Sequence, residues 1–288
     1  MKRKDFISKV ILGTTSTVVG ASLLKAEDQT LKTNLLKQVG FNHLPNKEEK
    51  TMKTVLHKAE TRGHANHGWL DSHHTFSFAN YYNPDRVHFG VLRVLNDDVV
   101  APGMGFGTHP HDNMEIISIP LSGDLKHKDS MGNEAVIREG DVQVMSAGTG
   151  VFHSEYNKND DAEVRFLQIW VFPNKKNVEP RYDQISIREI ARKNEFYQVL
   201  SPNKDDEGVW IHQDAWFSLG DFDKGNEANY KLNKLDNGVY LFVLEGEVEV
   251  NGQKLGKRDG LGITDTTAFN LKSSVDSRVL LMEVPMEV

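Results

Sequence analysis

Two pairs of residues in the first half of the chain could bind a metal ion. His109 and His111 are separated by one residue, and so are His153 and Glu155. Side chains two apart on a β-strand point to the same face, so each pair would present two ligand atoms to one point. Three imidazoles and one carboxylate suit Fe, Ni, Cu, Mn, Co or Zn, whereas Ca and Mg prefer oxygen ligands alone. The sequence therefore predicts one divalent transition metal bound by these four residues.

Other residues compete with this assignment. Glu115 has the same strand parity as the first histidine pair if the strand stays regular that far, so it is a rival carboxylate ligand, or else a hydrogen-bond partner that orients an imidazole. Four histidines lie between residues 64 and 74, but the aromatic residues around them favour a packed first strand over a second metal site. His127 and His212 are lone histidines, for which we expect satisfied or surface positions.

The elements that must position these side chains are strands. From Thr54 onward, short apolar runs are bounded by Gly, Pro, Asn and Asp, a pattern typical of an all-β protein. Residues 114–145 and 238–264 share one layout, so we expect a barrel that occurs twice. Pro110 cannot donate to a sheet ladder, so its strand must lie at an edge or contain a bulge. The spacing of residues 186–198 predicts a short connecting helix.

Two motifs and several longer segments resemble a known family. The first motif, Gly103-x5-His109-x-His111-x3-Glu115-x7-Gly123, is similar to the first cupin motif. The second, Gly140-x7-Gly148-x4-His153-x3-Asn157, approximates the other cupin motif, with Ser146 in place of the usual proline. Residues 62–78, 105–116, 143–150 and 153–157 resemble the pirin family, above all its bacterial members with quercetin 2,3-dioxygenase activity. The resemblance covers nearly the whole chain after residue 55.

The resemblance implies a bicupin, two double-stranded β-helix (jelly-roll) barrels packed together. Its N-terminal barrel would hold one metal through the residues that match the family's ligands, namely His109, His111, His153 and Glu155. The family does not use the counterpart of Glu115. The second barrel lacks a ligand set, because within it no H-x-H precedes Gly246 and Phe269-Asn270 falls near the place of the last histidine. Fe2+ is the expected metal, with Ni, Cu, Mn, Co and Zn as alternatives.

We divide the chain into four parts. Residues 1–27 have a basic start and a mostly uncharged stretch, which predicts a signal peptide that loosely resembles a twin-arginine signal. Residues 28–54 are interpreted as a linker, 55–185 as the N-terminal metal-binding domain, and 186–288 as a C-terminal cupin-like domain without metal ligands. The expected location is the periplasm after export, and the alternative is the cytoplasm.

Composition limits the partners. The net charge of −7 is not accompanied by a Lys and Arg stripe, which argues against binding nucleic acid or an anionic membrane. The absence of cysteine excludes disulfides, thiolate metal sites and cysteine nucleophiles. We therefore expect a monomer, not membrane-bound after removal of the signal peptide, that binds a small aromatic substrate and O2.

Three hypotheses for the function follow. In the first, a metal-dependent dioxygenase cleaves quercetin or a related flavonol, and Glu155 takes the hydroxyl proton of the substrate, a role carried over from the resemblance. In the second, a non-catalytic pirin acts as a redox-sensitive protein-interaction module. In the third, the metal only stabilises the fold.

Overall fold

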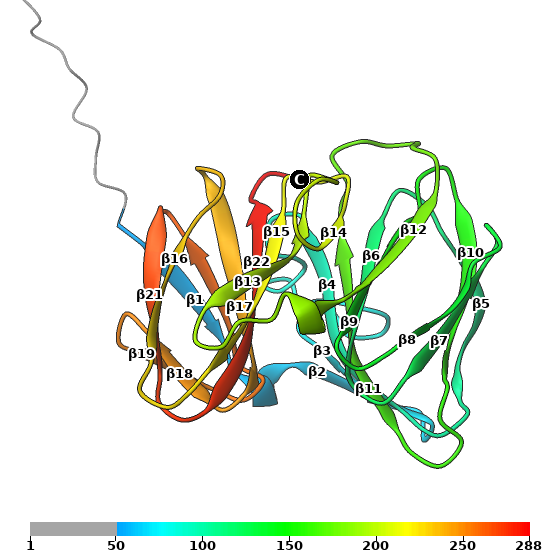
Figure 1. Cartoon of the computed structure of the whole chain (residues 1–288), viewed down its shortest axis with the longest axis horizontal. Helices are drawn as coiled ribbons and strands as arrows, with labels where there is room; N and C mark the ends of the chain where they lie inside the picture. Colours follow the sequence, from blue (N-terminus) through cyan, green and yellow to red (C-terminus); the bar gives the residue numbers. More distant parts are fainter. Residues whose placement is uncertain (1–50) are drawn as a thin grey trace, which may run out of the picture. The chain divides into compact units, whose positions relative to one another are not determined.

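The computed structural model describes residues 51–288, which form two β-barrels with almost no helix (Figure 1). Each barrel consists of two facing sheets, one of seven strands and one of four, and the sheets do not close into a continuous ring. The all-β bicupin architecture is thus confirmed. The predicted signal peptide and most of the predicted linker lie outside the described residues. Within those residues no helix is long and apolar enough to cross a membrane.

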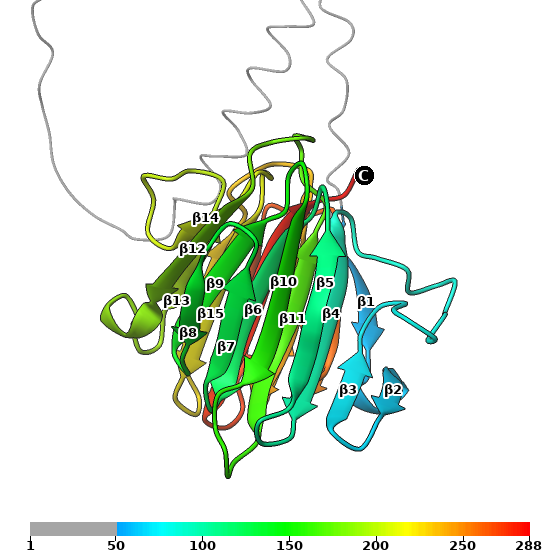
Figure 2. The same ribbon diagram turned by 90° about the vertical axis from the view of Figure 1, so that its right-hand side faces the viewer.

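The N-terminal barrel carries the candidate site. Its large sheet has the strand order β12 (Arg181–Ser186), β9 (Asp141–Ser146), β6 (Glu115–Ser122), β11 (Val164–Val171), β4 (Leu92–Val100), β3 (Leu70–His74) and β2 (Gly63–Asn66). Its small sheet has the order β5 (Gly105–His111), β10 (Val151–Asn157), β7 (Leu125–Asp129) and β8 (Glu134–Ile137), and faces the viewer in Figure 2.

The C-terminal barrel repeats this arrangement. Its large sheet has the order β1 (Lys53–His57), β20 (Gly260–Thr264), β17 (Asn237–Glu245), β22 (Ser277–Pro285), β15 (Trp216–Phe222), β13 (Phe196–Ser201) and β14 (Val209–Trp210). Its small sheet has the order β16 (Glu227–Lys231), β21 (Ala268–Ser273), β18 (Glu247–Val250) and β19 (Gln253–Gly256).

The connections add two facts to the domain prediction. Strand β1 precedes the N-terminal barrel in the sequence but pairs with β20 of the C-terminal barrel, and its first two residues, Lys53 and Thr54, belong to the predicted linker. The predicted connecting helix is a single 3-10 turn, Ile187–Glu189, and Phe196 already begins β13. The boundary between the domains at residues 185 and 186 remains a prediction.

The apolar core has a layer between the barrels and a separate interior in each barrel. Alternate residues of β11 contribute to two of these regions. Leu167 and Ile169 pack in the layer between the barrels, whereas Phe166 faces the interior of the N-terminal barrel. Complete burial of one such large apolar side chain stabilises the fold by about 2 kcal/mol. The interior of the C-terminal barrel forms one apolar cluster, but that of the N-terminal barrel is split into two. Polar side chains lie between those two clusters.

Candidate metal centre

Strand β5 positions the first histidine pair at the edge of the small sheet. Among the strands of residues 51–288, β5 pairs only with β10, and His109 lies opposite His153 in the register. Pro110 lies opposite the exposed Phe152, and the register shifts between His153 and Glu155. Both features expected from the proline, an edge strand and a bulge, are therefore present.

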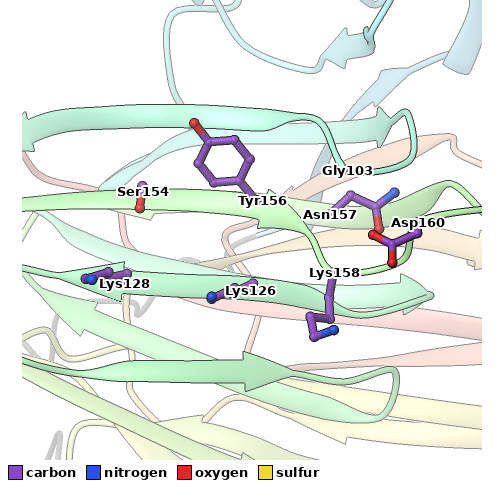
Figure 3. A pocket seen from close by; sticks show the side chains of 8 residues that line it. All are labelled: Gly103, Lys126, Lys128, Ser154, Tyr156, Asn157, Lys158 and Asp160. Carbon is purple, nitrogen blue, oxygen red and sulfur yellow. The ribbon is translucent and has the colours of Figure 1, made fainter.

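Side-chain alternation along β10 separates the candidate site from the solvent face. His153 and Glu155 are each 2 % exposed and point into the barrel. Ser154 and Tyr156 line an outer hollow of about 470 Å³ together with Lys126 of β7 and other residues of the sheet surface (Figure 3). The period of two that the sequence argument assumed thus holds along this strand.

Three predicted ligands converge inside the barrel. Ligand atoms of His109, His111 and His153 lie within 4.8 Å of one another. Their ring centroids are 4.4 Å apart for His109 and His153, and 4.9 Å apart for each of the other two pairs. The Nδ1 atom of His109 is 2.8 Å from the carbonyl oxygen of Gly107, to which it can donate. That bond would leave the Nε2 lone pair of His109 free for a metal ion.

The fourth predicted ligand lies beside this group. Glu155 belongs to a second cluster with His153 and His127, whose ligand atoms also lie within 4.8 Å of one another. Its Oε1 accepts a hydrogen bond of 2.9 Å from Ser118, and its Oε2 accepts one of 2.7 Å from the Nε2 of Gln168. The carboxylate is therefore held in place by two donors from the opposite sheet.

The chemistry of the donor set fits a transition metal. Both ring nitrogens of His153 are buried and have no hydrogen-bond partner among the described residues, an arrangement that usually requires an unseen ligand or water. Burial and the neighbouring histidines lower the pKa of His111 to about 4, and burial with His109 and His127 nearby lowers that of His153 to about 3. At neutral pH both imidazoles are uncharged, as metal ligation requires.

Glu115 is not brought to the site. The turn between β5 and β6 includes Asn113 with a positive φ of 44°, so strand parity does not continue across it. Glu115 shares its face of β6 with Ile117, which packs between the barrels, and it accepts a hydrogen bond of 2.7 Å from Ser146. Burial raises the pKa of this carboxyl to about 7 although Arg181 lies nearby. Both roles considered for Glu115 at the metal were wrong.

His127 is the residue that sequence reasoning missed. It is fully buried, its Nε2 is 3.1 Å from Oδ2 of Asp129, and its ring centroid is 5.3 Å from that of His153. The expectation of a satisfied lone histidine accounts for the bond to Asp129 but not for the closeness to the site. The alternation of Leu125, His127 and Asp129 with exposed lysines was the available signal for an inward position.

The other histidines considered have different surroundings. His64 and His73 form a largely exposed cluster with Asp71 on the β2–β3 hairpin, in which His64 Nε2 is 2.8 Å from Asp71 Oδ1. His74 is buried and contacts Phe78, so it lies in a packed strand as expected, although this strand is β3 and not the first strand of the described residues. His212 is half-buried beside the ring of Trp210, away from the cluster of predicted ligands.

A cavity of about 710 Å³ opens beside the candidate ligands. His109, His111 and Glu155 contribute to its lining, and five aromatic residues form much of the rest: Trp69, Phe78, Tyr81, Phe106 and Trp170. This volume lies in the range of small-molecule sites. Met145 is not among the lining residues and packs in an apolar cluster with Ile116.

Comparison with known proteins agrees with this geometry. The family model described as Pirin matches residues 55–171, and the model described as Quercetinase C-terminal cupin domain matches residues 198–284. The chain is 44 % identical over 234 residues to the quercetin 2,3-dioxygenase of Escherichia coli K12. The match covers 80 % of this chain and 98 % of that protein. A pirin-like protein of Caulobacter vibrioides is 39 % identical over 222 residues, and that match covers 77 % of this chain and 95 % of the Caulobacter protein.

A solved structure is similar throughout the described region. The crystal structure of the bacterial pirin YhhW from Escherichia coli in complex with nickel(II) has a TM-score of 0.77 and 42 % sequence identity to this chain. The match covers 82 % of this chain and 100 % of that one. A relative with the same fold thus binds a divalent transition metal, which agrees with the cluster of His and Glu side chains described above.

Proposed function

This chain belongs to the pirin family, and from that premise we propose that it is a metal-dependent dioxygenase that opens a ring of a flavonol such as quercetin with O2. The observation that carries the proposal is that candidate metal ligands line a cavity large enough for a small aromatic molecule. The names of the curated relatives support the reaction class. The aromatic walls of the cavity would pack against a planar ring system.

We propose that His109, His111, His153 and Glu155 bind the metal, with Fe2+ as the native ion. When bound, such an ion supplies a Lewis acid that lowers the pKa of a coordinated hydroxyl group. Glu155 would accept the hydroxyl proton of the substrate, a role supported by its position in the lining of the cavity and by its hydrogen bond from Ser118. The aromatic walls would exclude water from the ring that is cleaved.

The test is turnover by protein of defined metal content. Protein stripped by a chelator and reloaded with Fe2+, Ni2+, Cu2+, Mn2+, Co2+ or Zn2+ should consume O2 with quercetin for at least one metal and none in the stripped form. The His111→Ala variant is expected to bind metal weakly and to lose O2 consumption. Absence of turnover with every metal would reject the proposal. Elemental analysis of protein from the native host tests Fe2+ independently.

The alternatives make different demands on the site. A metal that only stabilised the fold would not need ligands that line a cavity of this size, and a chelation-induced fall in melting temperature without any turnover would favour that role. A redox-sensitive interaction module would instead change its binding to another protein with the oxidation state of the metal. We favour the enzyme because the cavity gives a substrate access to the ligands.

A further inference from the structure

A row of polar side chains crosses the inner face of the large N-terminal sheet. Consecutive register partners on β3, β4, β11, β6 and β9 form this polar belt, which consists of His74, Asn96, Gln168, Ser118 and Gln143. All five are buried or nearly so. In the large C-terminal sheet, a row of register partners carries Leu261, Leu241 and Leu281 on three strands and becomes polar only at Ser218 and Gln198 on the next two. Burial of polar groups in place of leucines is costly unless hydrogen bonds offset it, so the belt requires a functional reason.

Part of the belt is explained by the metal centre. Ser118 and Gln168 each donate to Glu155, as described above. The bond from Gln168 Nε2 fixes the orientation of the amide, so its Oε1 must accept from another donor, and that oxygen is buried without a partner among the described residues. The belt therefore offers more acceptors than the candidate ligands use.

The remaining acceptors face the cavity. Asn96 and Asp98 both line it, two residues apart on the inner face of β4. The Oδ1 of Asn96 is buried and has no hydrogen-bond partner in the described part of the chain. Asp98 accepts a hydrogen bond from Ser72 at one oxygen. Neither residue belongs to the groups of metal-ligating side chains.

We propose that Asn96 and Asp98 bind the substrate through hydroxyl groups that do not contact the metal, so that this wall selects a polyhydroxylated aromatic over one of the same ring shape without those groups. The inference rests on the proposed function, because it concerns the same cavity. It adds the residues that distinguish one flavonol from another.

Asp98 can form a hydrogen bond with a phenolic hydroxyl group in either protonation state. Burial raises the pKa of Asp98 to about 7, although Ser72 opposes this, so the protonated and ionised forms are both accessible near neutral pH. A phenolic hydroxyl can donate to the ionised form and accept from the protonated form. A ligand without such hydroxyl groups would displace water from these acceptors and leave them unpaired, which is the usual basis of strong rejection.

The experiment compares two ligands and measures binding without turnover. Quercetin and the unsubstituted parent flavonol share the hydroxyl and carbonyl groups that can coordinate a metal, but only quercetin has further hydroxyl groups. Dissociation constants are measured by fluorescence titration of Ni2+-loaded protein in the absence of O2. We expect Asp98→Ala to weaken quercetin binding about tenfold and to leave parent flavonol binding unchanged, as loss of one hydrogen bond to a charged group implies.

Two further variants separate hydrogen bonding from shape. Asp98→Asn keeps an acceptor oxygen and the contact with Ser72, so it should retain most of the preference for quercetin, and it also carries the test if Asp98→Ala does not fold. Phe78→Leu, on the aromatic wall, is the matched control and should weaken both ligands equally. Asn96→Ala should reduce the preference as Asp98→Ala does.

The outcomes distinguish this inference from the proposed function. Equal losses for both ligands in Asp98→Ala, or wild-type protein that binds the two ligands equally or binds neither, would overturn it. Wild-type protein that prefers quercetin and loses that preference in the Asp98 and Asn96 variants supports it, even if no metal gives O2 consumption. In that last case the dioxygenase proposal alone fails.

Discussion

Release of Glu155 from its two donors tests how the site holds its carboxylate. The variants Ser118→Ala and Gln168→Leu each remove one hydrogen bond, of 2.9 Å and 2.7 Å respectively, from a carboxylate that is 2 % exposed. Loss of a donor removes one of the two contacts that hold the buried carboxylate beside the histidines. Metal affinity should therefore fall in each variant.

The magnitude follows from the charge on the acceptor. A hydrogen bond to a charged group contributes about 1.5–3 kcal/mol, and 1.4 kcal/mol corresponds to a factor of ten in an equilibrium constant. We therefore expect a loss of about tenfold in metal affinity for Ser118→Ala and of up to about a hundredfold for Gln168→Leu, whose bond is the shorter. The double variant should lose less than the product of the single losses, because both donors serve one carboxylate.

The assay is competition for Ni2+ or Co2+ against a chelator of known affinity at neutral pH. Ser218→Ala in the C-terminal barrel is the matched control, since this buried serine contacts Tyr230 and not the candidate site. It should change the melting temperature without changing metal affinity. If Ser118→Ala and Gln168→Leu both bind the metal within about twofold of the wild type, the assignment of these residues as holders of a metal-ligating Glu155 is wrong.

Three further predictions concern the ligands, acid and the metal. Glu155→Gln should reduce metal affinity by about a hundredfold or more, whereas Glu115→Gln, on the face of the large sheet that points away from the barrel interior, should leave it unchanged in isothermal titration, and equal losses would contradict the assignment. Burial lowers the pKa of His57 and of His74 to about 4, so the folded state binds fewer protons than the unfolded state below pH 6.5. Their contribution to the free energy of unfolding is complete above pH 6.5 and is lost as the pH falls toward 4, by up to about 1.4 kcal/mol per pH unit for each. In metal-free protein the lowered pKa values of His111 and His153 act in the same direction, and the raised pKa values of Asp98 and Glu115 act in the opposite direction. Urea denaturation of metal-free protein should show a shallower pH dependence in His57→Gln, and an unchanged slope would refute this. Removal of the metal by a chelator should lower the melting temperature, since a ligand present at a hundred times its dissociation constant stabilises the folded state by about 2.7 kcal/mol, and an unaltered melting curve would show that the metal does not bind the folded chain preferentially.

Local patterns carried the predictions that the structure supports most directly. The alternation of side chains along a strand is a property of a few consecutive residues, so the spacing of His109 and His111, and of His153 and Glu155, was sufficient to place each pair on one face. Pro110 likewise constrained its own strand to an edge, because the missing N–H group is independent of the rest of the fold.

What the sequence by itself determined, then, is the presence of two same-face pairs of candidate ligands, the all-β class and, through family resemblance, the two barrels and the choice of Glu155 over Glu115. Tertiary structure decided which further polar groups gather around those candidate ligands. Glu115 is excluded because strand parity is lost at a turn, and His127 and Asp98 are brought near the site by pairing between strands that are far apart in the chain. Register between strands depends on the packing of whole sheets, so no local spacing can reveal it.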